Sequence, residues 1–303
     1  MSTGGEYAAD DRWAPIIVDR AVLPFSPRPA PHHAYRPDTI VDGWSTPEFT
    51  VRLASTRGYA HRYDGTPRQD DAVVAVHAGT GAVVFAVADG VSAAPQSHVG
   101  ARLACRTAVD AVIRALDERG AVDWTSVVEA TAIRLTRHAG EALGTSRPDV
   151  AAAERLLATT LVAGTVEPDP SGPIATLVQA GDSGAWLLQA GRFEGLLTGK
   201  TDPDSPVFSS AVAALPRVTG HVRPFSLRLP ADATLLVGTD GFGDPLGDRS
   251  GLVGDLFRRV LSDPPPPLGL AHALDFSRET FDDDRTLLAV WPAGHVRRHP
   301  SRG

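Results

Sequence analysis

The sequence contains a single cysteine, Cys105, among 303 residues. One thiol cannot form an intramolecular disulfide, and it excludes a zinc site built from several cysteines. Long apolar runs are missing too: the most apolar stretch, AVVFAVA at 82–88, is far shorter than the ~18 residues of a membrane-spanning helix. A chain of this length buries enough surface to fold without disulfides or a structural metal.

The chain also lacks an excess of positive charge, because 29 Lys and Arg stand against 36 Asp and Glu, a net charge of −7. Since phosphate backbones bind basic surfaces, this balance argues against a nucleic-acid-binding protein. Residues 1–15 have neither the basic start nor the apolar stretch of a signal peptide. We therefore expect a monomeric, cytoplasmic protein with no nucleic-acid or membrane partner.

Hydrophobic periodicity divides the chain into three parts. Residues 1–45 are rich in Pro, Ala, Asp and His and predict an irregular N-terminal extension. Residues 46–293 contain short strand-like runs and two stretches with helical spacing, 99–117 and 124–142, and residues 294–303 form a basic tail. This order lacks the regular βαβ alternation of a parallel sheet. It predicts an α+β domain, a four-layer α/β/β/α sandwich of two mainly antiparallel sheets flanked by helices.

Acidic residues stand at the ends of several predicted strands. The four groups that share this position are Asp70-Asp71, Asp89, Asp240 and Asp282-Asp283-Asp284. Turn formation explains any one of them, since Asp-Gly commonly follows a strand. Together they are harder to explain, because clustered carboxylates repel each other and are costly to bury. Mg²⁺ or Mn²⁺ prefers oxygen ligands and would remove this penalty, and converging carboxylates could hold two such ions about 3.5–4 Å apart.

Six motifs occur in a recognisable order. They are Gln69-Asp70-Asp71-Ala72, FAVADG (85–90), Thr159-Thr160-Leu161, Gly181-Asp182-Ser183, LLVGTDGFGD (235–244) and Asp283-Asp284-Arg285-Thr286. In this order the chain resembles the metal-dependent Ser/Thr protein phosphatases of the type 2C (PPM) family, and bacterial members in particular, over roughly residues 50–291. The resemblance implies two antiparallel sheets between pairs of helices, with the metals in a cleft at one edge. It also implies hydrolysis of phosphoserine and phosphothreonine on proteins, with a Ser/Thr kinase or its targets as partners.

The resemblance implies a role for each matching residue. The implied metal ligands are Asp70, Asp71, Asp89, the carbonyl of Gly90, Asp240 and Asp283, which would hold two Mn²⁺ or Mg²⁺ ions. Asp89 and Asp240 would be catalytic through a hydroxide that bridges the metals and attacks the phosphomonoester in line. The register of the first motif stays open, because either Asp70 and Asp71 or Gln69 and Asp70 match the acidic pair of the family.

The sequence departs from the family at the phosphate-binding arginine, because Thr66 occupies its expected position. Arg62 and Arg68 lie nearby and could bind a phosphate, although the pattern fits ordinary solvated arginines equally well. Residues 198–232 fall where the family has a mobile flap beside the active site, and we expect substrate preference to reside there.

Two other functions are consistent with parts of the sequence. Gly181-Asp182-Ser183-Gly184 matches most of the GDSGG motif of trypsin-like serine proteases, in which Ser183 would be the nucleophile. Those proteases are disulfide-bonded and all-β, so we interpret Asp182-Ser183 as a turn between strands. Ser183→Ala would abolish a protease and spare a metallophosphatase. The other alternative is a pseudophosphatase, a binding module that keeps the fold without the chemistry, as the missing arginine would allow.

Overall fold

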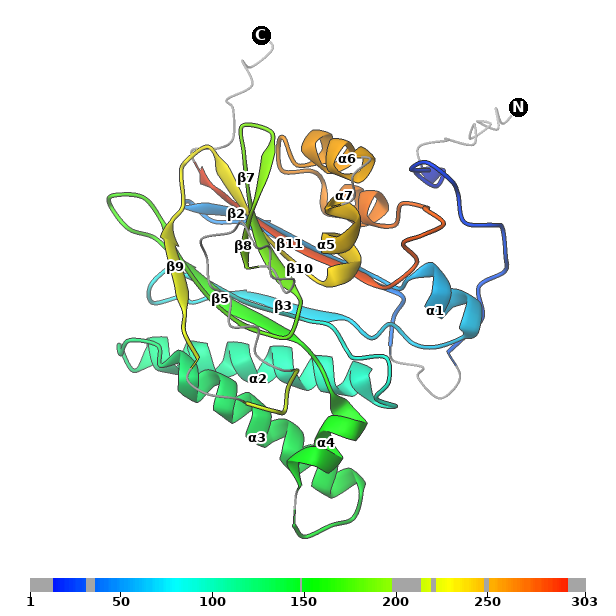
Figure 1. The fold of residues 1–303 in the computed structure, drawn as a ribbon. Helices are drawn as coiled ribbons and strands as arrows, with labels where there is room; N and C mark the ends of the chain where they lie inside the picture. Colours follow the sequence, from blue (N-terminus) through cyan, green and yellow to red (C-terminus); the bar gives the residue numbers. More distant parts are fainter. Residues whose placement is uncertain are drawn as a thin grey trace, which may run out of the picture.

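Two antiparallel sheets pack face to face, and each is covered on its outer side by helices (Figure 1). The computed structural model describes residues 13–30, 36–147, 149–197, 214–218, 222–247 and 251–293. One apolar core lies between the two sheets, and a further core lies between each sheet and its helices. The predicted four-layer α/β/β/α sandwich is therefore confirmed.

The strand order is β1-β2-β11-β10-β7-β8 in the six-stranded sheet and β3-β4-β5-β6-β9 in the five-stranded sheet. The strands of the first sheet are β1 (Thr39–Ser45), β2 (Phe49–Thr56), β7 (Gly184–Gln189), β8 (Arg192–Leu197), β10 (Ala233–Gly238) and β11 (Arg285–Pro292). Those of the second sheet are β3 (Asp71–Val76), β4 (Val83–Ala88), β5 (Leu161–Glu167), β6 (Ile174–Ala180) and β9 (Phe225–Arg228).

Helices form the two outer layers. The helices that pack on the five-stranded sheet and on one another are α2 (Ser97–Asp117), α3 (Trp124–Ala142) and α4 (Val150–Leu157). Those on the six-stranded side are α5 (Asp240–Leu246), α6 (Leu252–Val260) and α7 (Pro267–Leu274), and α1 (Tyr59–Asp64) connects β2 to β3. None of the helices in the described ranges combines the length and the apolar character that a membrane crossing requires.

Strand β4 shows how the sequence pattern fills two interfaces at once. Val84 and Ala86 belong to the core under α2 and α3, whereas Phe85 and Val87 belong to the core between the sheets. Because successive side chains of a strand point to opposite faces, a strand with a layer on each side is apolar throughout. Asp89 follows directly, where the chain leaves both cores.

The N-terminal extension is more ordered than the sequence predicts. Residues 39–45 form β1, the edge strand that pairs with β2, so the prediction of an irregular extension over 1–45 was wrong for this part. Residues 13–30 are irregular but docked: Val18 is buried, and its N–H donates to the carbonyl of Ser277 at 3.0 Å. The predicted basic tail, 294–303, lies outside the described residues.

Candidate metal centre

Strand direction brings the acidic residues to one edge of the sandwich. Because β3 and β4 are antiparallel neighbours, Asp70 before β3 and Asp89 after β4 lie at the same end of the five-stranded sheet. Asp240 after β10 and Asp283 before β11 share an end of the other sheet for the same reason. The hydroxyls of Thr239, after β10, and Thr286, in β11, both donate to Asp70, so the two ends face each other. Burial raises the pKa of Asp89 well above its usual range, and the charges of Asp70 and Asp240 raise it further.

Asp89, Asp182 and Asp240 form what we call the first acidic group. Each of the three offers a carboxylate oxygen, and these oxygens all lie within 4.8 Å of one another. Burial raises the pKa of Asp240 to about 6, with further contributions from the charges of Asp182 and Asp283. Carboxylates this close cannot all be ionised at low cost, so the group favours either protons or a cation.

A second group consists of His61 on α1 with Asp283 and Asp284 before β11. Nδ1 of His61 lies 2.8 Å from Oδ1 of Asp284 and 3.9 Å from Oδ1 of Asp283. Asp284 is buried and also accepts hydrogen bonds from the N–H groups of Gly58, at 2.6 Å, and Gln69. Its oxygens are therefore committed to the protein, whereas the side chain of Asp283 is about half exposed.

Asp70 lies buried between the two sheets' ends and uses only one of its carboxylate oxygens. Oδ2 accepts hydrogen bonds from the hydroxyls of Thr239, at 2.8 Å, and Thr286, at 2.7 Å. Oδ1 is buried and has no hydrogen-bond partner among the described residues. The same is true of Oε1 of the preceding residue, Gln69. Burial and then the charge of Asp284 raise the pKa of Asp70 well above its usual range.

These observations fit a divalent cation. An unpartnered buried carboxylate oxygen costs free energy unless it finds a hydrogen-bond donor or a cation. The donor set is made of carboxylate and carbonyl oxygens, which are the ligands that Mg²⁺ and Mn²⁺ prefer. The edge is thus equipped to hold hard cations close to Asp70 and the first acidic group.

Two glycines allow the segments of the centre to approach each other. A Cβ on Gly241, the residue after Asp240, would lie 1.9 Å from the carbonyl oxygen of Asp284. A Cβ on Gly58 would lie 2.2 Å from the carbonyl carbon of Asp283. The turn that carries Asp283 and Asp284 is therefore packed between two backbones that have no side chain at the contact.

Comparison with known proteins decides the family. The family model described as Protein phosphatase 2C matches residues 57–272, more than half of the chain. The chain belongs to the protein phosphatase 2C family. It is thus a member of a family of Ser/Thr protein phosphatases. No curated protein matches the sequence significantly.

Solved structures share the fold of this phosphatase 2C chain. RsbX in complex with magnesium is 10% identical with a TM-score of 0.53, and the match covers 84% of this chain and 100% of that chain. The catalytic domain of PstP with two manganese ions is 16% identical with a TM-score of 0.53, covering 81% and 98%. MsPP from Mycobacterium smegmatis in complex with cacodylate is 21% identical with a TM-score of 0.51, covering 80% and 97%. At these identities the matches show the fold alone.

The structure separates the two registers of the first motif of this phosphatase. Asp71 is the first residue of β3, and its Oδ2 lies 2.8 Å from Nη1 of Arg36, while its Oδ1 accepts from the N–H of Ala72 at 2.9 Å. Both carboxylate oxygens of Asp71 are therefore already bound by Arg36 and by the backbone of Ala72. Gln69 and Asp70 carry the unpartnered buried oxygens instead. The geometry favours the register in which these two residues match the acidic pair of the family.

Neither predicted phosphate-binding arginine is free. Arg68 is only 1% exposed, and its guanidinium donates to the hydroxyl of Ser55 and to the carbonyl of Asp70, so the expectation that it binds phosphate was wrong. Arg62 forms an ion pair with Asp275 at 2.8 Å and lies over the ring of Tyr59. Both guanidinium groups are thus already bound by groups of the protein. Most of the predicted flap, residues 198–213 and 219–221, lies outside the described residues.

The Gly181-Asp182-Ser183 motif is placed in a way that the sequence did not predict. Asp182 is a member of the first acidic group, although the sequence pattern predicts a turn residue at this position. Ser183 is 0% exposed and hydrogen-bonded to Thr160, which excludes it as a protease nucleophile. The sequence did carry a signal for this role of Asp182, because Gly181-Asp182-Ser183 is one of the six motifs that match the family.

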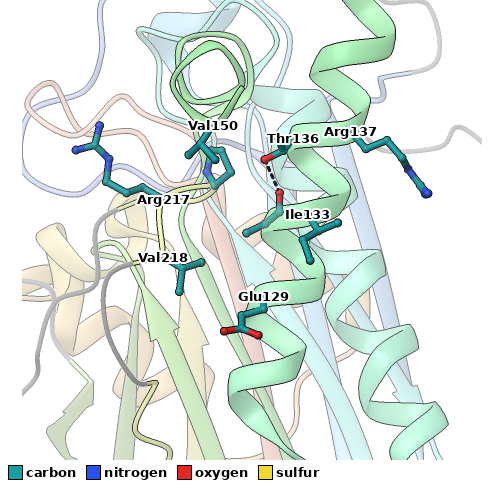
Figure 2. A pocket seen from close by; sticks show the side chains of 9 residues that line it. Glu129, Ile133, Thr136, Arg137, Val150, Arg217 and Val218 are labelled. Carbon is teal, nitrogen blue, oxygen red and sulfur yellow. Dashed lines mark hydrogen bonds between the residues drawn. The ribbon is translucent and has the colours of Figure 1, made fainter. Parts of the chain in front are cut away.

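A separate apolar pocket of about 590 Å³ lies between α3, the start of α4 and residues 216–218 (Figure 2). Ile133 and Val150 contribute to its lining, and Glu129 on α3 is the carboxylate among its lining residues. Apolar pockets are common ligand sites, but this one has a single carboxylate and so lacks the cluster of acidic ligands that holds divalent cations for phosphomonoester chemistry. The acidic edge is therefore the candidate active site of this phosphatase.

Proposed function

We propose that this chain hydrolyses phosphoserine and phosphothreonine on proteins with two Mn²⁺ or Mg²⁺ ions. The observation that carries the proposal is the first acidic group, where oxygens of Asp89, Asp182 and Asp240 lie within 4.8 Å of one another. Membership of the 2C family supports the reaction class. The structures of RsbX with magnesium and of PstP with two manganese ions support the choice of metals.

The proposed ligands come from both sheets. They are Asp70, Asp89, the carbonyl of Gly90, Asp182, Asp240 and Asp283. Asp89 would be shared between the ions, because its carboxylate lies with those of Asp182 and Asp240, and β4, which it follows, pairs with β3, which Asp70 precedes. Asp71 is left out, since its carboxylate is bound by Arg36. Bound ions would lower the pKa of a water molecule, supply the hydroxide that attacks phosphorus and balance the charge of the phosphate.

The residues of the chain would act by holding this arrangement in place. Thr239 and Thr286 bind one oxygen of Asp70 and so direct the other oxygen to the centre. Asp284 ties the turn that carries Asp283 to the backbone of Gly58. Preorganised ligands of this kind need no rearrangement when the reaction begins.

The test is hydrolysis of a phosphothreonine peptide and of p-nitrophenyl phosphate with Mn²⁺, with Mg²⁺ and with EDTA. We expect turnover with metal, no turnover in EDTA, and a loss of at least ~100-fold in Asp89→Asn and Asp240→Asn, because each removes a ligand charge. Asp110→Asn, at an exposed position on α2, is the matched control and should keep full activity. Full activity in both site variants, or none with any metal, would contradict the proposal.

A binding module without catalysis is the second candidate, favoured by the absence of a free arginine at positions 62 and 68. Calorimetry separates the two, because the enzyme needs the cations and a module has no such need. A protein with a native melting transition that binds no Mn²⁺ would favour the module. Phosphorylated proteins, including a Ser/Thr kinase or its targets, are the partners that we propose for the enzyme. The monomeric state and the cytoplasmic location stay predictions.

A further inference from the structure

Two buried hydroxyl groups connect separate parts of the first acidic group. Oγ1 of Thr160, just before β5, accepts a hydrogen bond from the N–H of Asp89 at 2.8 Å. The same oxygen lies 2.6 Å from Oγ of Ser183. The side chain of Thr160 is thus hydrogen-bonded both to the backbone of one acidic residue and to the neighbour of another, Asp182.

The backbone of Asp89 is held on both sides by the Thr159-Thr160 pair. The carbonyl of Asp89 accepts from the N–H of Thr160 at 2.7 Å and from the hydroxyl of Thr159 at 2.8 Å. With the bond to Oγ1 of Thr160, both the backbone N–H and the carbonyl of Asp89 are bound by two consecutive residues. The position of Asp89 at the end of β4 therefore depends on Thr159 and Thr160.

The turn that carries Asp182 is seated on the same threonine. Gly181 has a φ of +82°, and a Cβ there would lie 2.7 Å from Cγ2 of Thr160, so the turn packs directly on the methyl group. The carbonyl of Ser183 accepts from Nε2 of Gln179 at 2.7 Å, which closes the turn on its other side. Asp182 lies between Gly181 and Ser183, and its position follows from theirs.

We propose that Thr160 and Ser183 are positioning residues that set the spacing between the carboxylates of Asp89 and Asp182, and with it the affinity of the centre for divalent cations. The inference rests on the proposed function. Ionised Asp89 and Asp182 repel each other, so their spacing must be imposed by the bonded structure around them. Partners that orient ligands in this way typically change metal affinity by 10–100-fold when they are removed.

The test compares variants that differ only in the hydroxyl group. Thr160→Val keeps the shape of the side chain and leaves the N–H of Asp89 without its partner, whereas Thr160→Ser keeps the hydroxyl. Ser183→Ala removes the other half of the pair. The matched control is Thr165→Val on β5, since Thr165 is also buried and its hydroxyl donates to Glu167, away from the centre.

The measurements are the Mn²⁺ dissociation constant by calorimetry and the rise in Tm that saturating Mn²⁺ produces over the EDTA-treated protein. We expect roughly tenfold weaker binding in Thr160→Val, about threefold weaker binding in Ser183→Ala and near wild-type binding in Thr160→Ser. The double variant should bind no more weakly than Thr160→Val, because the two hydroxyls act as one unit. Thr165→Val should lower Tm equally with and without metal and leave the affinity unchanged.

Each outcome decides between distinct claims. Wild-type protein that binds no Mn²⁺ would overturn the proposed function itself. Wild-type binding together with unchanged affinity in Thr160→Val and Ser183→Ala would overturn only the positioning role. The same would follow if Thr165→Val weakened binding as much as Thr160→Val. Should Thr160→Val fail to fold, Ser183→Ala and Thr160→Ser decide the matter.

Discussion

His61 forms an ion pair with the buried carboxylate of Asp284, with Nδ1 of the imidazole 2.8 Å from Oδ1. His61 belongs to α1 and Asp284 directly precedes β11, so the pair joins the helix after β2 to the last strand of the same sheet. The neighbouring Asp283 is a proposed metal ligand. A contact that holds the fold together thus lies directly beside the centre.

This pair should make the free energy of unfolding depend on pH. Burial opposes the charge on His61, but the hydrogen bond and the charge of Asp284 outweigh it, so the pKa of His61 is raised. A raised histidine pKa contributes stability that is complete below the unfolded value, about 6.5, and is lost as the pH rises through the folded value. Urea unfolding in EDTA should therefore show a larger loss of stability from pH 6 to pH 8 in wild type than in His61→Gln. Equal losses in the two proteins would contradict the role of the pair.

Asp240 should destabilise the metal-free protein at neutral pH. Its pKa is raised to about 6 by burial and by the charges of Asp182 and Asp283. The folded state therefore holds this proton more tightly than the unfolded state, and stability falls as the pH rises from about 4 to about 6. Asp240→Asn removes this cost and should raise the free energy of unfolding in EDTA at pH 7 by about 2 kcal/mol.

The same variant should lose the stabilisation by metal. Mn²⁺ stabilises the wild-type protein because it binds the folded state and not the unfolded state. Asp240→Asn has lost a ligand charge, so Mn²⁺ should raise its Tm less. Thermal melts with Mn²⁺ and with EDTA measure both effects, and Asp110→Asn on α2 is the control that should change neither. An Asp240→Asn protein that is less stable than wild type in EDTA would show that the carboxylate has a structural partner.

The sequence predicts which residues form the central strands better than it predicts which residues meet at the ends of those strands. Apolar runs such as 82–88 indicate strands that are buried on both faces, and antiparallel pairing within each sheet places Asp70 beside Asp89 and Asp240 beside Asp283. That the two sheet ends meet depends on how the sheets pack, which no local pattern shows. Residues 39–45 were missed because TIVDGWS follows a Pro-rich segment and contains an Asp-Gly pair that is typical of turns. Strand β1 carries a weak apolar signal because none of its residues is fully buried.

Individual side-chain roles were less predictable because they depend on contacts between distant segments. Spacing alone could not show that Arg36 binds Asp71, or that Arg68 is buried against Ser55. The role of Asp182 was not predicted, because turn preference alone explains an aspartate after a glycine. Local patterns cannot distinguish a turn residue from a ligand when the other ligands come from elsewhere in the chain.

Gly241 should tolerate no side chain, because a Cβ there would lie 1.9 Å from the carbonyl oxygen of Asp284. Backbone atoms cannot move aside as a flexible side chain can, so Gly241→Ala should cost at least ~3 kcal/mol of unfolding free energy and displace the turn before β11. Gly254→Ala is the matched control in α6, where a Cβ would meet only the side chain of Arg258, at 3.5 Å. It should be neutral or stabilising by up to ~1 kcal/mol. Equal Tm values for the two alanine variants would contradict the close contact.

The docked segment 13–30 should stabilise the domain through Val18. This side chain is 7% exposed and packs in the core under α6 and α7, and its N–H donates to Ser277 at 3.0 Å. Val18→Asp would bury an unpaired carboxylate, so we expect a loss of about 2–4 kcal/mol of unfolding free energy, measured by urea titration. Leu23→Asp, at a position that is 80% exposed in the same segment, is the matched control and should change stability by less than ~0.5 kcal/mol. If both variants unfold like wild type, the segment does not contribute to the stability of the domain.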